Sequence, residues 1–250
     1  MQDVPLTIPH IFERAEKYHP HKGIVTATGS GLERVAYGEW AARTRKLGGV
    51  LDALGISADG RVGTFAWNTA RHLELYFAVP CTGRVLHTLN IRLFPEQLTY
   101  IVNHADDEVI FVDRSLLGLL APLLPTFERL QHLVMMDDGK GDIPADLNGH
   151  ELLDYEELLA AADPVEFAVD DEHRAASMCY TSGTTGNPKG VVYTHRSTFL
   201  HTMGAMTADS LGGRESDVIL PVVPMFHANA WGLAHAAVAT GADLIMPGPD

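Results

Sequence analysis

A short segment rich in glycine and hydroxyl groups is the part of the sequence best suited to chemistry. It reads TSGTTGNPKG, from Thr181 to Gly190, with three glycines, four hydroxyl side chains and the positive charge of Lys189. Glycines let the backbone turn tightly and bring N–H groups close to an anion. Hydroxyl groups are adjustable donors that can also bind Mg²⁺, and lysine adds a point charge that suits a polyphosphate. The composition of this segment therefore predicts a phosphate-binding loop.

A hydrophilic hairpin turn is the alternative interpretation of this loop, because strands are expected on both sides of it, at 175–180 and 191–194. A turn explains a few of these residues but not all ten in this order. The loop also differs from a Walker A loop, since no Gly-Lys-Ser/Thr sequence opens a helix. Phosphate binding by a loop between two strands accounts for the whole segment.

Strands and helices alternate in front of this loop and must position it. Apolar periodicity and helix or strand breakers predict the following elements: a helix capped by Thr7, a hairpin turn at Gly29 and Gly31, a helix ending at Gly55, strands at 61–67, 84–88, 108–112 and 132–136, and helices at 70–79, from Pro95 to Val102 and, interrupted by prolines, at 116–130. This β-α-β-α order predicts a three-layer α/β/α fold with mostly parallel sheets.

Two polar stretches divide the sequence. The first, 137–150, has no periodicity and is expected to be a loop, followed by a short helix at 155–162. The second is an acidic connector at 163–172, interpreted as a solvated link rather than a metal site. We therefore expect a first α/β subdomain at 1–172 and, at 173–250, the start of a second one that contains the phosphate loop.

Composition limits the partners and the compartment. The 250 residues include 18 basic and 32 acidic ones, a net charge of −14, so nucleic acid is not an expected partner. The cysteines, Cys81 and Cys179, are expected to be buried thiols in a reducing compartment. The 13 histidines show no zinc or haem spacing. The start of the sequence lacks the basic and apolar regions of a signal peptide, so we expect a cytoplasmic protein.

One stretch is apolar and long enough to raise the question of a membrane span. Residues 218–242 contain no Asp, Glu, Lys or Arg. Pro221 and Pro224 interrupt the stretch early, and His227, Asn229 and His235 are polar. A strand followed by a buried helix is the better prediction, and no membrane span is expected.

Two sequence blocks carry a family resemblance. The string YTSGTTGNPKGVVYTHRS, from Tyr180 to Ser197, resembles the signature of the adenylate-forming (AMP-binding) superfamily. The string PVVPMFHANAWGL, from Pro221 to Leu233, is similar to a segment of bacterial medium- and long-chain fatty-acyl-CoA synthetases, and so are AWNTARHLELYFAVP and HTLNIRLFPEQLTYIVNHA. The resemblance covers about 4–250 and implies an incomplete N-terminal AMP-binding domain without the family's C-terminal domain.

The resemblance implies a reaction and its substrates. Such enzymes use ATP and Mg²⁺ to convert a fatty acid into an acyl adenylate and pyrophosphate, then pass the acyl group to CoA. Carboxylate and phosphate are both anions, so donors and Mg²⁺ must offset their repulsion. The resemblance also allows a homodimer. It implies that this chain alone cannot make acyl-CoA, because the family's later motifs for adenine, ribose and the catalytic lysine do not occur in it.

The resemblance assigns site residues one by one. The stretch from Ser182 to Lys189 would hold the β- and γ-phosphates, and Thr181 is the candidate hydroxyl ligand of Mg²⁺. His227 would line the junction of nucleotide and acyl chain, and Trp231, four residues later and expected on the same helical face, would gate a fatty-acid tunnel. The full set expected to bind the nucleotide and the acyl chain is Thr181, Ser182, Gly183, Thr184, Thr185, Gly186, Lys189, His227, Ala228, Trp231 and Gly232, with Lys189, Thr184 and Thr185 as the catalytic groups.

Alternatives remain open at this point. His235 and Asp243 stand where an aromatic and a basic residue are expected in this subfamily, which affects the shape of the tunnel wall. The acid could therefore be an aryl or short-chain acid instead of a fatty acid. A different class of function, non-catalytic binding by a truncated relative of the ligases, also fits the sequence.

Overall fold

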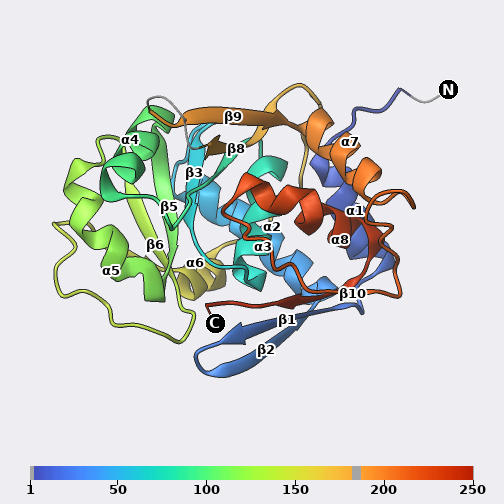
Figure 1. Ribbon diagram of the computed structural model, residues 1–250, viewed down its shortest axis with the longest axis horizontal. Helices are drawn as coiled ribbons and strands as arrows, with labels where there is room; N and C mark the ends of the chain where they lie inside the picture. Colours follow the sequence, from blue (N-terminus) through green and yellow to red (C-terminus); the bar gives the residue numbers. More distant parts are fainter. Residues whose placement is uncertain (1–2, 182–186, 250) are drawn as a thin grey trace.

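The computed structural model describes residues 3–181 and 187–249, and its chain forms two β-sheets (Figure 1). The larger sheet has seven strands in the order β7-β6-β5-β3-β4-β8-β9. All its neighbouring strands are parallel except the β8–β9 pair. Its strands are β3 (Arg61–Phe65), β4 (Val85–Thr88), β5 (Asp107–Asp113), β6 (His132–Met136), β7 (Leu152–Asp154), β8 (Ala175–Thr181) and β9 (Lys189–Thr194).

The smaller sheet joins the two ends of the described chain. Its order is β10-β11-β1-β2, and its strands are β1 (Gly23–Thr28), β2 (Gly31–Ala36), β10 (Val218–Ile219) and β11 (Asp243–Met246). β1 and β2 form an antiparallel hairpin in which Thr28 lies opposite Gly31, which confirms the turn predicted at Gly29 and Gly31. β11 pairs parallel to both β1 and β10.

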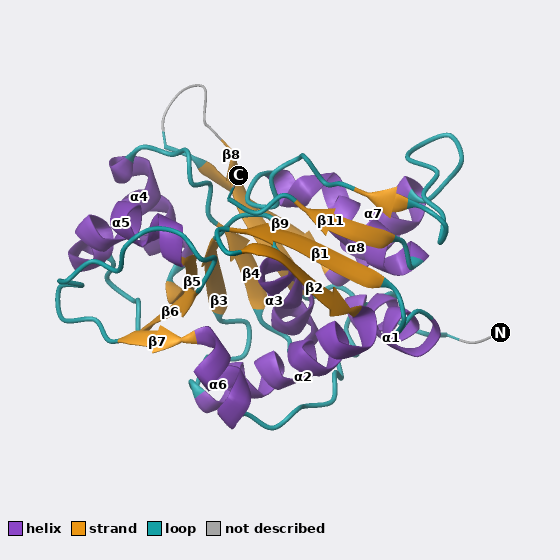
Figure 2. Ribbon diagram, turned by 90° about the horizontal axis from the view of Figure 1, so that it is seen from below, coloured by secondary structure: helices purple, strands orange, loops and turns teal. Residues whose placement is uncertain are grey.

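Helices cover both faces of the larger sheet, as Figure 2 shows from below. The helices are α1 (Ile8–Tyr18), α2 (Tyr37–Ala53), α3 (Ala70–Cys81), α4 (Pro95–Ala105), α5 (Leu117–Leu120), α6 (Tyr155–Ala161), α7 (His195–Ala205) and α8 (Leu233–Thr240). Three 3₁₀ segments, η1 (Arg114–Leu116), η2 (Ala121–Thr126) and η3 (Ala228–Gly232), complete the elements.

The helix α3 lies between the two sheets. It contacts β4 and β8 of the larger sheet and β1 of the smaller one, and every residue from His72 to Cys81 is buried. Its core also includes residues of α1, α2 and α8. A second core forms on the opposite face of the larger sheet, where α4 and α5 pack. This arrangement confirms the predicted three-layer α/β/α fold with mostly parallel sheets.

Most predicted elements occur where the sequence indicated, with two differences of detail. The helix α1 begins after Thr7, but the Thr7 hydroxyl forms no capping hydrogen bond; the His10 N–H donates to the Thr7 carbonyl instead (3.3 Å). The region predicted as an interrupted helix at 116–130 breaks into η1, α5 and η2 and ends at Thr126, because Phe127 is extended.

The stretch at 218–242 forms a strand and a buried helix, as predicted. The strand β10 is only two residues long, and the helix α8 begins at Leu233. Within the part of the chain that the structure describes, no helix is long and apolar enough to cross a bilayer. In each sheet, a strand that precedes Glu172 pairs with one that follows it: β1 with β11, and β4 with β8. The division into subdomains at Glu172 stays a prediction.

Candidate functional site

The ends of the predicted phosphate loop lie where β8 ends and β9 begins, at the connected end of this antiparallel strand pair. Thr181, the last residue of β8, lies opposite Lys189, the first residue of β9. Both side chains are exposed. Lys189 forms no ion pair with any residue that the structure describes, so its charge is available to an anion. The predicted site residues Ser182, Gly183, Thr184, Thr185 and Gly186 lie outside the described residues.

Side-chain contacts of Tyr180 hold the strand that leads to this loop. The ring nitrogen Nδ1 of His104 lies 2.7 Å from the Tyr180 hydroxyl, and the Tyr180 ring lies 5.2 Å from the ring of His87. Burial raises the pKa of Tyr180 to about 12, so its hydroxyl stays protonated and can donate. These contacts fix Tyr180, the residue before Thr181 at the end of β8.

A fully buried hydrogen bond joins His87 of β4, the strand next to β8, to Asp107 of β5. His87 Nδ1 is 2.8 Å from the Asp107 carboxylate, and neither side chain is exposed. Burial raises the pKa of Asp107, and His87 opposes that shift. The pair fits because Gly63 of the intervening strand β3 has no side chain: a Cβ there would lie 3.0 Å from Ile110 and 3.4 Å from Asp107.

Asn68 fixes the segment that precedes His227. Its Nδ2 donates to the carbonyls of Pro221 (2.8 Å) and Val223 (3.0 Å), and its Oδ1 accepts from the N–H of Met225 (2.7 Å). Tyr76 adds a hydrogen bond from its hydroxyl to the Met225 carbonyl. Asn68 follows β3 directly, so the segment is held at the carboxyl ends of the parallel strands, where ligands of such sheets commonly bind.

Residues 228–232 form a left-handed turn, and the predicted helical face of His227 and Trp231 is wrong. The φ angles of Ala228, Asn229, Ala230, Trp231 and Gly232 are 45°, 49°, 51°, 55° and 72°. A right-handed helix begins only at Leu233. Non-glycine residues adopt this region rarely and at a cost, so contacts with the rest of the fold must impose the turn.

Asn229 is the central contact of this turn. Its Nδ2 donates to the Ser177 hydroxyl (2.8 Å) on β8, and its Oδ1 accepts from the Thr88 hydroxyl (3.1 Å) on β4. His201 of α7 adds a contact from its Nε2 to the Trp231 carbonyl (2.8 Å). These bonds anchor the turn to the larger sheet and to α7.

A pocket of about 420 Å³ lies between this turn, β8, β9 and α7. This volume is within the range of small-molecule sites. Trp231 stands at its wall with 66% of its surface exposed, and His227 is exposed as well. The lining residues are Ser177, Tyr193, Ser197, Thr198, His201, Ala228, Asn229, Trp231, Gly232 and His235. The structure thus brings together three of the four predicted site residues of this segment, Ala228, Trp231 and Gly232, and places His227 next to them in sequence.

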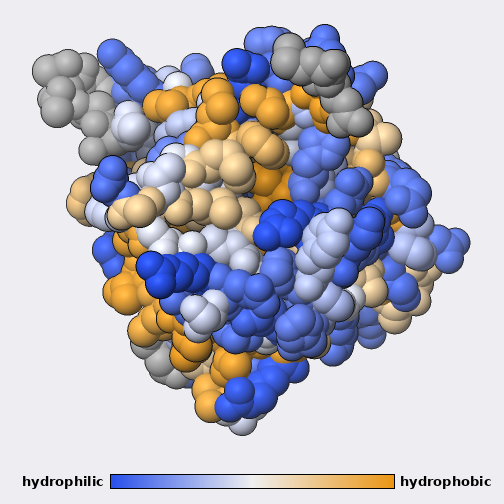
Figure 3. Space-filling view, turned by 90° about the vertical axis from the view of Figure 1, so that its right-hand side faces the viewer, coloured by the Kyte–Doolittle hydropathy of each residue, from blue (hydrophilic) through white to orange (hydrophobic). Residues whose placement is uncertain are grey.

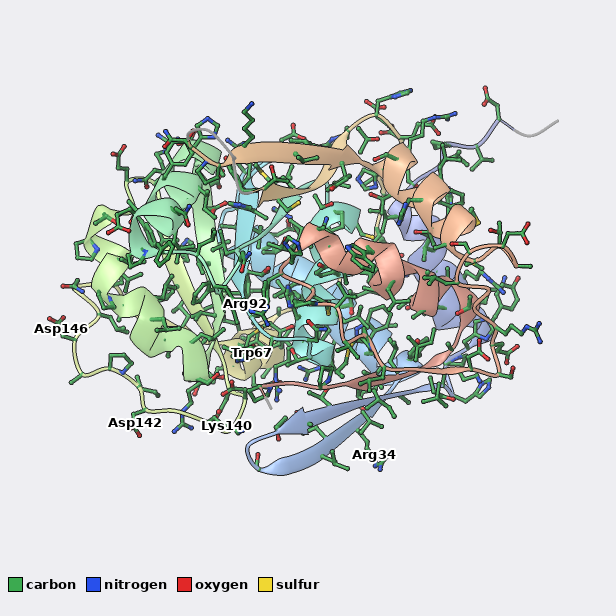
Figure 4. All side chains as sticks on the ribbon, viewed as in Figure 1. Arg34, Trp67, Arg92, Lys140, Asp142 and Asp146 are labelled. Carbon is green, nitrogen blue, oxygen red and sulfur yellow. The ribbon has the colours of Figure 1, made fainter. Side chains whose placement is uncertain are left out.

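A positive charge that the sequence did not indicate lies near this segment. The Arg92 guanidinium is 5.8 Å from the centre of the Phe226 ring, and Figure 4 labels both Arg92 and Trp67. Trp67 follows β3 and Arg92 follows β4, so both stand beyond the carboxyl ends of parallel strands. No motif marked Arg92, because its contact with Phe226 spans most of the chain.

Ser177, Thr88 and Asn229 were also missed as site residues. Ser177 and Thr88 are ordinary strand residues, and no local pattern distinguishes them. Asn229 could have been identified from the sequence, because it is an amide side chain in a long stretch without charged residues. The unusual Asp243 has a structural role instead: its Oδ1 accepts from the Gly23 N–H (2.6 Å), next to the paired strands β1 and β11.

The metal prediction rests on Thr181 alone. Among residues 3–181 and 187–249, no group of three or more His, Cys, Asp or Glu side chains is arranged to hold a metal ion. Thr181 is exposed, and its hydroxyl forms no hydrogen bond to a described residue. The role of Thr181 as a ligand of Mg²⁺ stays a prediction.

The face that contains α7 carries exposed apolar side chains. Leu200 and Met203 of α7 are 48% and 37% exposed, and Leu211 after it is 60% exposed. Figure 3 shows hydrophobic side chains near the top of this face among hydrophilic ones.

Sequence comparisons identify relatives of the chain. The chain is 45% identical over 252 residues to the 3-methylmercaptopropionyl-CoA ligase of Ruegeria lacuscaerulensis, covering 100% of this chain and 46% of that protein. It is 44% identical over 246 residues to the medium-chain-fatty-acid–CoA ligase of Ectopseudomonas oleovorans, covering 98% of this chain and 45% of that one. The chain thus spans about half the length of these curated relatives.

Solved structures share the fold. A long-chain-fatty-acid–CoA ligase from Archaeoglobus fulgidus superposes with a TM-score of 0.83 at 22% identity, covering 99% of this chain and 48% of that chain. The model of the AMP-binding enzyme family matches residues 12–250, nearly the whole chain, and the protein therefore belongs to that family.

Proposed function

We propose that the complete protein is an ATP-dependent acid–CoA ligase that activates a medium- or long-chain fatty acid. One observation carries the proposal: β8 contributes Ser177 to the pocket and Thr181 to the predicted phosphate loop. Four residues of strand span about 13 Å. An acid bound in the pocket would therefore have its carboxylate within reach of a nucleotide held at the loop.

The first step would join the acid to ATP. A carboxylate oxygen attacks the α-phosphorus, and the bond from this phosphorus to the pyrophosphate oxygen breaks. Lys189 would bind the phosphates and offset the charge of the departing pyrophosphate. Thr181 would hold Mg²⁺, which supplies charge neutralisation for two anions that must approach each other.

The second step would transfer the acyl group to CoA. The thiol sulfur attacks the carbonyl carbon of the acyl adenylate, and AMP leaves with the bonding electrons. The left-handed turn would separate the nucleotide from the acyl chain, with His227 on the nucleotide side and Trp231 at the pocket wall. Both roles follow the resemblance and the position of Trp231 in the pocket.

A second candidate substrate is a short acid with a polar atom in its chain. The 3-methylmercaptopropionyl-CoA ligase, which is 45% identical to this chain, favours it. The pocket wall also mixes aromatic, hydroxyl and imidazole side chains, which suits an acid of this kind as well as a fatty acid.

The test is acid-dependent release of pyrophosphate by the purified complete protein with ATP and Mg²⁺. Acids from propionic to palmitic, 3-methylmercaptopropionic acid and benzoic acid are compared by kcat/KM. A maximum at a medium or long fatty acid supports the proposal, and a maximum at 3-methylmercaptopropionic or benzoic acid replaces the fatty acid as substrate. No release with any acid, by a folded protein that binds ATP, would favour non-catalytic binding.

A further inference from the structure

The left-handed turn beside the pocket has to be held by contacts from outside it. The four residues before Gly232 all have positive φ, and among them only Asn229 is of a type that adopts such angles readily. Ala228, Ala230 and Trp231 have no such preference. Without its contacts the turn would relax to another conformation, and Trp231, which stands at the pocket wall, would move with it.

Asn229 makes the buried contacts of this turn. It is 7% exposed, and its side chain bonds to Thr88 of β4 on one side and to Ser177 of β8 on the other. Both bonds are buried, whereas the bond between His201 and the Trp231 carbonyl lies at the surface, where water can replace it. One amide group therefore ties the turn to two neighbouring strands of the larger sheet.

Thr88 lies outside the pocket but bonds to its wall. The side chain is 1% exposed, and its hydroxyl donates to Asn229 Oδ1 (3.1 Å). Thr88 is not one of the described residues that line the pocket. A substitution at Thr88 therefore leaves the lining side chains unchanged, and its effect on substrate choice has to pass through Asn229 and the turn.

We propose that Asn229 is a positioning residue: its bonds to Thr88 and Ser177 fix Trp231 at the pocket wall and so set the range of acyl chain lengths that the pocket accepts. This proposal rests on the proposed ligase function and on the pocket as the site of the acyl chain. A side chain that acts on a substrate needs supporting hydrogen bonds to keep its geometry. A fixed Trp231 ring gives the pocket one length, whereas a ring on a loosened turn lets acids of several lengths bind.

The experiment measures kcat/KM for pyrophosphate release by the complete protein with even-numbered fatty acids from butyric to palmitic acid. Thr88→Val keeps the shape of the side chain and removes its hydroxyl group. It should lower the ratio between the best acid and an acid four carbons away by about three- to tenfold, the effect of one lost hydrogen bond. Thr88→Ser keeps the hydroxyl group and should keep this ratio. A ratio that Thr88→Val leaves unchanged overturns the proposal.

Thr64→Val is the matched control. Thr64 of β3 is fully buried, and its hydroxyl lies 3.0 Å from Nε2 of His72, so the variant loses a bond of the same kind away from the turn. It should lower the free energy of unfolding as Thr88→Val does, but it should leave the ratio between acids unchanged. If the ratio falls equally in both variants, it reports stability alone and the proposal is wrong.

A double-mutant cycle tests whether the effect passes through Trp231. In a Trp231→Ala background, Thr88→Val should change the ratio no further, because the side chain that the bond positions is gone. An additive change contradicts the proposal.

Fluorescence separates this proposal from the ligase function. If no acid releases pyrophosphate, the ligase function fails, but the fluorescence anisotropy of Trp231, taken as the difference between each protein and its Trp231→Phe variant, still decides. A lower anisotropy in Thr88→Val but not in Thr88→Ser supports the positioning role of Asn229, and an equal anisotropy refutes it.

Discussion

Replacing Asn68 with alanine should destabilise the protein markedly and loosen the segment that leads to His227. The change removes the two bonds from Nδ2 to the Pro221 and Val223 carbonyls and the bond from the Met225 N–H to Oδ1. Pro221 and Met225 are buried, so their backbone groups lose partners that water does not readily replace.

The magnitude follows from these three bonds. Each buried group left unpaired costs about 1–3 kcal/mol, and the partly exposed Val223 carbonyl costs less, so we expect a loss of about 3 kcal/mol in the free energy of unfolding. For a protein of this size, a loss of about 3 kcal/mol lowers Tm by roughly 6–12 °C. Urea denaturation followed by circular dichroism measures the free energy, and an unchanged m-value shows that the folded state stays compact.

Asn90→Ala is the matched control. Asn90 makes one exposed bond, from the Arg92 N–H to its Oδ1 (3.0 Å), so its loss should cost less than about 1 kcal/mol. Asn68→Asp keeps the acceptor for Met225 but sets a buried carboxylate against the Pro221 and Val223 carbonyls, so it should cost at least as much as Asn68→Ala. If Asn68→Ala costs no more than Asn90→Ala, the segment is not held by this side chain and the reasoning is wrong.

Three further predictions concern the loop, the pocket and the response to acid. Lys189→Ala in the complete protein should raise the KM for MgATP about 10- to 100-fold, as expected for a lost charge-assisted contact, while Lys17→Ala leaves it unchanged; equal KM values would remove Lys189 from the site. Trp231→Ala should leave Tm nearly unchanged, because the side chain is 66% exposed, and should alter the dependence of rate on acyl chain length. Trp40 is fully buried, so Trp40→Ala should lower the free energy of unfolding by about 3–5 kcal/mol. A comparable loss in Trp231→Ala would make Trp231 a core residue. Burial lowers the pKa of His72, His195 and His235 to about 4 each. Between about pH 6.5 and pH 4 the unfolded chain therefore binds more protons than the folded one. As pH falls through that window, each histidine lowers the free energy of unfolding by up to about 3 kcal/mol. Burial raises the pKa of Asp113 to about 8, so its contribution to the free energy of unfolding acts in the opposite direction and is lost as pH rises toward 8. Because three histidines oppose one aspartate, the urea midpoint should rise as pH increases from 4. A midpoint that stays constant between pH 4 and pH 8 would contradict the histidine argument.

Local patterns predicted the elements of the fold well, because apolar periodicity and breakers act within a few residues. The strand at 132–136 was predicted with its observed bounds, and the loop at 137–150 has no helix or strand. The hairpin turn before β2 depends on two glycines, which the sequence displays directly.

The left-handed turn could not be predicted in the same way. Ala228, Ala230 and Trp231 have no local preference for positive φ, and the sequence reads as the start of a helix. The bonds that impose the turn come from Thr88, Ser177 and His201, up to 141 residues away. The phosphate loop stays a prediction from composition, whereas the pocket depends on contacts that only the folded chain brings together.

The pairing of β1 with β11 bears on how the protein is made. Ile24 lies opposite Leu244, a separation of 244 − 24 = 220 residues. At a synthesis rate of about 5–20 residues per second, the edge of β1 that pairs with β11 stays unpaired for roughly 10–45 s. An unpaired strand edge is a template for association with other chains. Until β11 leaves the ribosome, this edge of β1 therefore stays open to association with other chains.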